Sequence, residues 1–447
     1  MIYRPAKHKL WDTWLYLHEG TYYLYYLVAD KASWEGVGLA TSPDGVHFSE
    51  VGVVIEKKPD ANWLGTGSVW KAEDFATSGR FLCNFSEWRN GRPEESSPSD
   101  GRQTIFFAES TDLVKWTRIE GVEFVQDERW YQPQGRWDCI YTIPRPGGGR
   151  YGYWTATPKD GPGVGFGETA DGVNWTALPP PKIEWGHAGP AEGCEAGAVE
   201  EIDGRYYLML GCYGHYDNRV NGMWSFVADA PEGPFKATKH NHALLTSRTR
   251  ANSYFARFFP TADGMLVNHH SIPREGGGEV AMAPLKRAVV DEHGTLRLGW
   301  WEGNEALKGA EVEPLAEFDM ATGIVVEGTL GGTPGVSGDA SGQLRVNAVD
   351  GNHGTLFAIR SGGVDIQPID VDGWGVMLAD DSIELGVGFG NEVRFRLMVR
   401  WNMAELYVND LLAQCYSLPP MEKGKVEARG GTWSDVTSAR AWRMSLG

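Results

Sequence analysis

The chain has 447 residues, of which 42% are hydrophobic and 22% charged, and its 41 Lys and Arg against 59 Asp and Glu give a formal net charge of −18. This length predicts two or three domains, and the apolar fraction is high enough for packed cores, which excludes a chain that is disordered throughout. No apolar run approaches the roughly 20 residues of a membrane-spanning helix, and so acidic a surface repels a phosphate backbone, so we expect neither membrane insertion nor nucleic-acid binding.

The first residues and the cysteines bear on the cellular compartment. Residues 1–14 (MIYRPAKHKLWDTW) lack the apolar stretch and the cleavage site of a signal peptide. The cysteines are odd in number and do not have the spacing of a zinc site. They are Cys83, Cys139, Cys194, Cys212 and Cys415. We therefore expect a cytoplasmic protein with free, mostly buried thiols; a secreted form from which a signal peptide has been removed is the alternative.

A strand signal recurs five times in the first two thirds of the chain. In each copy a Gly and one further residue precede a run of aromatic and aliphatic residues, as in Gly20-Thr-Tyr-Tyr-Leu-Tyr-Tyr26. The copies begin at Gly20, Gly79, Gly149, Gly204 and Gly264. Such runs are typical of β-strands, and the apolar spacing of helices is nearly absent from this region.

A turn signal accompanies the strand signal. It consists of a small residue, then Asp, often Gly, and then an aromatic residue. It occupies residues 41–48, 110–116, 169–175 and, in a looser form, 229–235. Asp and Gly suit the tight turn of a hairpin, and the copies lie about 60 to 70 residues apart. Five repeats of short antiparallel strands predict a five-bladed β-propeller over residues 1–305.

Beyond residue 305 the pattern changes. Residues 306–318 (ALKGAEVEPLAEF) have the composition of a linker. In residues 393–401 (VRFRLMVRW) apolar residues alternate with Arg, which is typical of a strand with one buried face, and residues 404–410 follow as its partner. Residues 319–447 are therefore predicted to form a C-terminal β-sandwich.

Three blades carry an acidic residue at a corresponding position. The first strand of each propeller blade lines the central channel, and Asp12, Asp138 and Glu195 each stand about 8 to 11 residues before the Gly of the strand signal. Corresponding positions around a closed ring converge on one point. Three carboxylates held together repel one another, which raises the pKa of at least one of them.

Glycosidic bond cleavage is a reaction that needs such a set. One ionised carboxylate attacks the anomeric carbon, one protonated carboxyl group donates to the leaving oxygen, and a third can balance the positive charge of the transition state. Asp12, Asp138 and Glu195 are therefore the candidate catalytic residues. Glu192 is a rival for the acid, although its spacing fits less well.

The segments around these acids resemble glycoside hydrolase family 32, the invertases, inulinases and levanases, and more distantly family 43. Asp12, with the strand that begins eight residues later, is similar to the family's nucleophile segment. Arg136-Trp-Asp138 resembles its Arg-Asp-Pro element, and Glu195 has the spacing of its acid/base Glu. The resemblance implies that Asp12 is the nucleophile, Asp138 the transition-state stabiliser and Glu195 the acid/base.

The resemblance extends over nearly the whole chain. Residues 64–68 (LGTGS) resemble the second-blade motif, residues 285–296 the last blade and residues 405–410 (ELYVND) the terminal sandwich signature. The last two favour family 32, because most family 43 proteins lack that sandwich. Beside the acids the chain departs from the pattern: Trp-Asp-Thr-Trp replaces Asn-Asp-Pro-Asn-Gly, the Arg-Asp-Pro has an inserted Trp and no Pro, and Cys-Glu-Ala replaces Glu-Cys-Pro. These departures indicate a divergent member and do not favour sucrose itself as the substrate.

The predicted function is that of a retaining glycoside hydrolase, which cleaves β-fructofuranosides of the fructan or fructo-oligosaccharide type through a covalent glycosyl-enzyme intermediate. The alternatives are a fructosyltransferase with the same intermediate, a family-43-like arabinofuranosidase or xylosidase, and a non-catalytic sugar-binding propeller. We expect a carbohydrate partner and no cofactor, and the sequence leaves a homodimer open.

Further residues near the acids are candidates for substrate binding. Tryptophan rings can stack on sugar faces, hydroxyl groups can bind sugar hydroxyls, and a guanidinium can orient a carboxylate. These candidates are Trp14, Trp63, Thr66, Ser68, Arg136 and Trp137. The histidines that could bind a metal are His187, His269 and His270. Because adjacent residues of a strand point to opposite faces, His269 and His270 would not bind one ion together, and we expect no metal.

Overall fold

A computed structural model describes most of the chain. The described residues are 1–30, 33–89, 101–186, 193–213, 222–238, 243–245, 247, 252–273, 279–314, 316–331, 342–349, 353–360, 362–370, 381–385, 392–430 and 438–446. No helix within these ranges is long and apolar enough to cross a membrane.

The first two sheets each contain a meander of antiparallel strands. The first has the order β1 (Lys9–His18), β2 (Thr21–Asp30), β3 (Ser33–Ser42) and β4 (Ser49–Glu56). The second has the order β5 (Trp63–Gly65), β7 (Phe81–Arg89), β8 (Arg102–Ser110) and β9 (Thr117–Phe124), with β6 (Val69–Lys71) also on β7 and the short α1 (Phe75–Ser78) before it.

The next three sheets repeat this arrangement. The third contains β10 (Trp137–Pro144), β11 (Arg150–Ala156), β12 (Val164–Thr169) and β13 (Trp175–Leu178). The fourth contains β14 (Ile183–Glu184), β15 (Gly193–Ile202), β16 (Arg205–Tyr213), β17 (Gly222–Ala228), β18 (Phe235–Ala237) and β19 (Ala243–Leu245). The fifth begins with β20 (Ser253–Thr261), β21 (Gly264–Ser271), β22 (Ala281–Met282), β23 (Lys286–Val290) and β24 (Leu296–Trp300).

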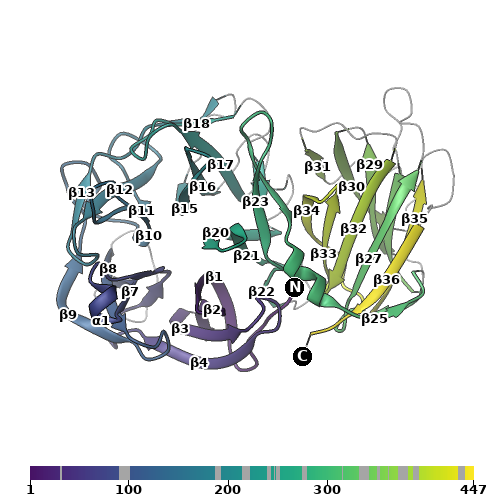
Figure 1. The fold of residues 1–447 in the computed structure, drawn as a ribbon, viewed down its shortest axis with the longest axis horizontal. Coiled ribbons are helices and arrows are strands. Elements are labelled where there is room, and N and C mark those ends of the chain that lie inside the picture. Colours follow the sequence, from purple (N-terminus) through teal and green to yellow (C-terminus); the bar gives the residue numbers. More distant parts are fainter. Residues whose placement is uncertain are drawn as a thin grey trace.

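The five sheets form a ring. Figure 1 shows β1, β10, β15 and β20 toward its centre, with the outer strands of each sheet at the rim. The last sheet meets the first, because the Asn268 Nδ2 group on β21 donates to the backbone oxygen of Thr13 on β1 at 2.8 Å. The predicted five-bladed propeller is therefore confirmed.

The recurring Gly of the strand signal has a conformational reason. Each one precedes or begins the second or third strand of its blade at a position with positive φ, between 65° and 115°. They are Gly20, Gly79, Gly149, Gly204 and Gly264. Side chains with a Cβ rarely adopt this conformation, so the hairpin turns select Gly.

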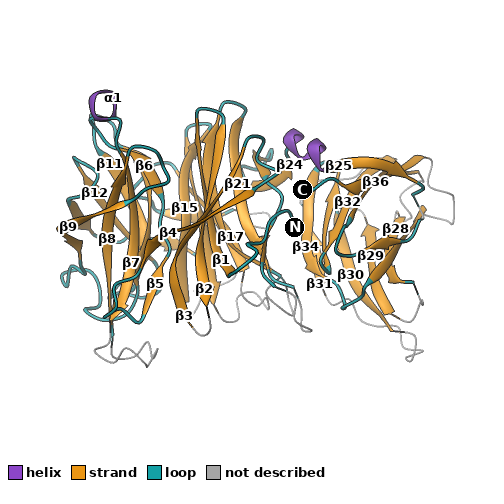
Figure 2. Cartoon of the chain, turned by 90° about the horizontal axis from the view of Figure 1, so that it is seen from below, coloured by secondary structure: helices purple, strands orange, loops and turns teal. Residues whose placement is uncertain are grey.

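Two further sheets form the C-terminal sandwich, which lies beside the fifth blade (Figures 1 and 2). One has the order β34 (Leu411–Ser417), β33 (Met403–Val408), β32 (Glu392–Arg400), β27 (Ile324–Gly331), β36 (Ser438–Met444) and β25 (Lys308–Val312). The other has the order β26 (Phe318–Asp319), β35 (Lys423–Gly430), β28 (Gly342–Ala348), β29 (His353–Arg360), β30 (Gly363–Asp370) and β31 (Asp381–Glu384).

The passage from propeller to sandwich is more ordered than a linker. A 3-10 helix (Glu302–Leu307) leads directly into β25, which pairs with β36. Part of residues 306–318 thus belongs to a sandwich sheet, because its backbone groups complete the ladder at that edge. The boundaries of the propeller (1–305) and the sandwich (319–447) stay predictions.

Buried polar contacts join the two parts. Gly299 of β24 pairs with Leu411 of β34, so that a propeller sheet continues into a sandwich sheet. Next to this pair the Lys286 Nζ group donates to Glu405 Oε1 at 2.5 Å, and the Tyr407 hydroxyl donates to Glu405 Oε2 at 2.9 Å. All three side chains are fully buried. Buried charges are tolerated when they are paired in this way.

Candidate active site

Three acidic side chains from three blades lie together near the centre of the ring. Asp12 is on β1, Asp138 on β10 and Glu195 on β15, and their exposed fractions are 5%, 2% and 4%. One Arg136 Nη2 group donates to Asp138 Oδ2 at 3.1 Å and also to Glu195 Oε1. Asp12 is near enough for the charge of Glu195 to affect its pKa. The structure thus brings the three predicted catalytic residues together.

Each acid lies at or beside an irregularity in its strand. The pairing of β1 with β2 shifts register at Asp12, whose φ of 29° lies in the left-handed region. The pairing of β10 with β11 shifts directly after Asp138, and that of β15 with β16 shifts after Ala196, one residue beyond Glu195. Bulges of this kind bend a strand and redirect a side chain, and strained backbone is frequent at functional sites.

Asp12 has a hydrogen bond to only one of its oxygens. The Thr66 hydroxyl donates to Asp12 Oδ2 at 2.6 Å. Oδ1 is buried, and within the described ranges it has no hydrogen-bond partner. Burial raises the pKa of Asp12 well above its usual value, the charge of Glu195 raises it further, and the Thr66 hydroxyl acts against both. This carboxyl group therefore holds a proton more readily than an exposed Asp.

Asp138 receives donors on both oxygens. The Ser86 hydroxyl donates to Oδ1 at 2.5 Å, and Arg136 donates to Oδ2. Burial raises the pKa of Asp138, whereas Arg136 and Ser86 lower it and offset part of the effect of burial. Gly65 makes room for this arrangement, because a Cβ there would lie 2.5 Å from Asp138 Oδ1 and 2.3 Å from Ser86 Oγ.

Two residues at this site were absent from the sequence-based set. Ser86 on β7 contacts Asp138, and Gln103 on β8 contacts Ser86, Arg136 and the backbone of Trp137. Each is a fully buried polar residue in a strand of mostly buried residues. That contrast is the signal that sequence could have provided, since a buried polar group needs a partner.

The other predicted binding residues differ in position. Thr66 contacts Asp12, and Arg136 contacts two acids, so both belong to the site. Trp63 is partly exposed and stacks on Trp88, with ring planes 3° apart and centroids 5.6 Å apart. Ser68 instead donates its hydroxyl hydrogen to the backbone oxygen of Ile140 at 2.5 Å, which joins the second blade to the third.

The stacking role predicted for Trp137 does not fit its complete burial, whereas the role predicted for Trp14 stays a prediction. Trp137 is fully buried, with its ring 5.0 Å from that of Trp154 in the packing between blades. Trp14 is 4% exposed and stacks on Tyr25 with centroids 5.8 Å apart. The Trp137 ring is therefore part of the core, whereas the Trp14 side chain also lines a cavity in the channel.

A cavity of about 470 Å³ lies further along the same first strands. Each blade contributes to its lining, among others through Trp14, Ser68, Tyr141, Glu200 and Phe258. Burial raises the pKa of Glu200 to about 7, while the Tyr141 hydroxyl, which donates to it at 2.6 Å, acts in the opposite direction. The three clustered acids are not among the residues that line this cavity.

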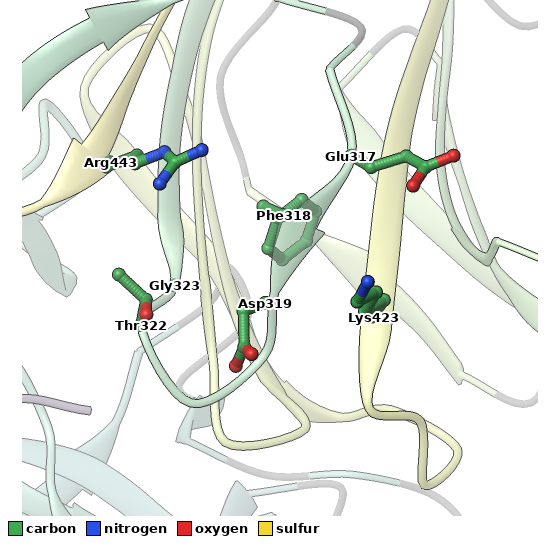
Figure 3. Close-up of a pocket in the computed structure, with 7 residues that line it drawn as sticks. All are labelled: Glu317, Phe318, Asp319, Thr322, Gly323, Lys423 and Arg443. Carbon is green, nitrogen blue, oxygen red and sulfur yellow. The ribbon is translucent and has the colours of Figure 1, made fainter.

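A hollow of about 230 Å³ on the sandwich is unrelated to the acids. Figure 3 shows Arg443 and Lys423 on either side of Phe318 in this hollow. Its lining consists of Glu317, Phe318, Asp319, Thr322, Gly323, Lys423 and Arg443. Acidic and basic side chains are mixed here, and no carboxyl group is buried as in the propeller site.

The residues around the acids do not favour a metal. Donor atoms of Asp138, Cys139 and Glu195 lie within 4.8 Å of one another. However, Arg136 already compensates both carboxylates, and burial raises the pKa of the Cys139 thiol, which keeps it protonated. His187 and Glu192, the rival acid, lie outside the described residues. His269 and His270 are fully buried, and the ring of His270 packs on Trp11 at 4.6 Å.

Comparison with known proteins gives the fold a family context. No protein-family model matches the chain, and no curated protein is significantly similar to it in sequence. Among solved structures, a glycoside hydrolase family 32 β-fructofuranosidase from Bombyx mori is 13% identical, with a TM-score of 0.74 over 99% of this chain and 94% of its own. A sucrose-6-phosphate hydrolase from Lactobacillus gasseri is 13% identical, with a TM-score of 0.73 over 98% of this chain and 91% of its own.

A third structure extends the range of substrates among these proteins. An exo-inulinase from Aspergillus awamori is 13% identical, with a TM-score of 0.67 over 100% of this chain and 97% of its own. The chain thus has the propeller and sandwich fold of these hydrolases, and the resemblance to family 32 is confirmed at the level of the fold.

Proposed function

We propose that this protein is a retaining glycoside hydrolase that acts on β-fructofuranosides. The observation that carries the proposal is the cluster of three buried carboxyl groups from three different blades, two of them joined by one guanidinium. Burying three acids together is costly, and proteins do so chiefly where the shifted proton affinities serve a reaction. The fold that this chain shares with the β-fructofuranosidase and the sucrose-6-phosphate hydrolase supports the same proposal.

In the proposed reaction Asp12 attacks the anomeric carbon, and Glu195 gives a proton to the leaving oxygen as the glycosidic bond breaks. Asp138 stabilises the positive charge that develops on the sugar ring. In the second half, Glu195 accepts a proton from water, and the oxygen of that water replaces Asp12 on the sugar. The carboxyl groups end in the protonation states in which they began.

The surroundings of Asp12 and Glu195 act on the two carboxyl groups in opposite directions. Arg136 contacts Glu195 directly and favours its ionised form, whereas the pKa of Asp12 is raised. A productive complex requires an ionised Asp12 and a protonated Glu195.

A substrate panel tests the proposed function. The protein is incubated with sucrose, inulin, levan and aryl arabinofuranosides, and released sugars are identified by chromatography. We expect fructose from at least one fructoside and loss of that activity in Asp12→Asn. Release from the arabinofuranoside alone would favour the family-43-like alternative, and transfer products at high substrate concentration would favour the transferase. Sugar binding without any release would contradict an enzymatic role.

A further inference from the structure

Gln103 lies at the centre of a hydrogen-bond network behind two of the three acids. Its side chain is fully buried on β8. The Gln103 Nε2 group donates to Ser86 Oγ at 2.7 Å, and Oε1 accepts from Arg136 Nε at 3.2 Å and from the backbone nitrogen of Trp137 at 3.1 Å. The amide thus contacts both side chains that donate to Asp138.

Only one orientation of this amide fits its neighbours. If the amide were turned over, its NH₂ group would face two other donors, the Arg136 Nε–H and the Trp137 N–H. Its oxygen would then face the Ser86 hydroxyl. An amide needs acceptors for its hydrogens and donors for its oxygen, so the observed orientation satisfies every contact. A further hydrogen bond, from Gln126 Nε2 to the Gln103 backbone oxygen at 2.8 Å, fixes the strand from which the side chain projects.

This orientation determines where the hydroxyl hydrogen of Ser86 goes. A serine hydroxyl has a single hydrogen, and its oxygen already accepts from Gln103. The hydrogen therefore points to the other neighbour, Asp138 Oδ1, at 2.5 Å. On the opposite side, the contact with Gln103 holds the Arg136 guanidinium where its Nη2 group reaches Asp138 Oδ2 and Glu195.

We propose that Gln103 is a positioning residue that keeps a donor on each oxygen of Asp138, so that Asp138 stays ionised beside the reacting sugar. The role of that ionised group in catalysis rests on the proposed function, whereas the effect of Gln103 on Asp138 does not. Gln103 contacts none of the three carboxyl groups itself and acts through Ser86 and Arg136.

The test uses Gln103→Met, which keeps the length of the side chain and removes both polar ends. The full-length protein is labelled with ¹³C at the Asp carboxyl carbons, and the signal of Asp138 is assigned by its absence in Asp138→Asn. Loss of aligned donors destabilises the ionised form, so we expect the Asp138 carboxyl to titrate about one pH unit or more above its wild-type midpoint. In Gln414→Met, which alters a buried glutamine of the sandwich, we expect an unchanged midpoint and a similar loss of stability.

A second variant separates a specific effect from general loosening. Ser86→Ala removes one of the two routes from Gln103 to Asp138. If Gln103 acts through Ser86, adding Gln103→Met to Ser86→Ala shifts the midpoint by less than Gln103→Met shifts it in the wild type. Full additivity would contradict that route, and an unchanged midpoint in Gln103→Met would overturn the proposal.

The pH dependence of kcat/KM is a second measurement, and a general loss of stability would not shift it. We expect Gln103→Met to lower kcat/KM by about tenfold or more and to move its acidic limb to higher pH. The carboxyl titration needs no turnover, so it tests the positioning role even in a protein that fails to hydrolyse any fructoside. A wild type without activity would therefore refute the proposed function and leave the Gln103 measurement decisive.

Discussion

Two hydroxyl groups distinguish the environments of the two aspartates at the residue scale. Thr66 donates to Asp12, and Ser86 donates to Asp138, each on one oxygen. Asp138 has a guanidinium on its second oxygen, whereas the second oxygen of Asp12 is buried without a partner in the described part of the chain. Two donors therefore hold the Asp138 carboxyl group in place and favour its ionised form against the effect of burial. Asp12 retains one free oxygen, which a nucleophile needs.

Removal of the Thr66 hydroxyl should change the pH dependence of the enzyme. This hydrogen bond lowers the pKa of Asp12, so Thr66→Val raises that pKa further. An ionised Asp12 is needed for attack, so the acidic limb of kcat/KM should move to higher pH, with roughly tenfold lower activity on that side. Thr355→Val is the matched control, because the Thr355 hydroxyl is buried and has no hydrogen-bond partner among the residues that the structure describes. An unshifted limb in Thr66→Val would speak against Asp12 as the nucleophile.

Gly65 provides a steric test of the same site. A Cβ at this position would come within 2.8 Å of both Asp138 oxygens, so Gly65→Ala must displace that carboxyl group or the strand. We expect kcat to fall by about a hundredfold, the loss that follows when one stabilising group of a transition state is misplaced. Gly163→Ala, whose nearest contact would be 3.3 Å from a proline side chain, should leave kcat close to wild type.

The sequence was sufficient to find the three acids but not their supporting contacts. The acids recur at similar distances from a repeated Gly. In a closed ring of blades such corresponding positions lie close together, so the recurrence predicts that the three acids meet. Trp137 shows the limit, because a residue next to an acid in sequence points to the other face of the strand and into the core. Gln103 shows another limit, since its side-chain partners lie on β7 and at the start of β10, between 17 and 34 residues away in the chain.

At the scale of elements, the turn signal has a common hydrogen-bond pattern. In three blades an Asp side chain accepts from the backbone nitrogens two and three residues later, and the preceding Ser or Thr hydroxyl donates to the same Asp. The acceptors are Asp44, Asp112 and Asp171. Such Asx turns close a hairpin with local bonds alone, which explains why the same residues recur in blade after blade.

These turns should contribute stability that is lost in acid. Burial is the largest single influence on Asp44 and raises its pKa, but hydrogen bonds from His47, Val46 and Ser42 together outweigh it and lower the pKa to about 2. A depressed folded-state pKa means that stability is present above the usual carboxyl pKa near 4 and is lost as pH falls toward 2. We expect Asp44→Ala to lower the free energy of unfolding by about 1 kcal/mol at pH 7. In denaturant titrations this difference should shrink below about pH 3.

The strand repeats were predictable because each blade is one local hairpin motif, encoded within about 60 residues. The bulges at Asp12, Asp138 and beyond Glu195 were not, since the register of a strand depends on its partner in space. The same holds for β25, which lies in the predicted linker and becomes a strand because β36 offers it an open edge.

At the scale of the molecule, a buried ion pair joins the propeller to the sandwich. Lys286 comes from the fifth blade and Glu405 from the sandwich, and neither has any exposed surface. Burial lowers the pKa of Lys286, while Glu405 raises it. The stability of this interface depends on both residues, because loss of either one leaves an uncompensated charge buried there.

Lys286→Met should therefore destabilise the protein by about 3 to 5 kcal/mol, and Lys286→Met combined with Glu405→Leu should recover part of that loss. Guanidinium unfolding followed by tryptophan fluorescence measures both. Lys236→Met, at a lysine with 57% side-chain exposure in the fourth blade, should have almost no effect. An equal loss in the single and double variants would contradict a role of charge pairing at this junction.

The central claim is that three acids from three blades perform a double displacement at one sugar. The most direct test is hydrolysis of a cleavable β-fructofuranoside in aqueous methanol, with the configuration of the methyl fructoside product determined by NMR. The account predicts the methyl β-fructofuranoside, with retained configuration, and no methanolysis product from Asp12→Asn. A product of inverted configuration, or an Asp12→Asn variant as active as the wild type, would contradict it.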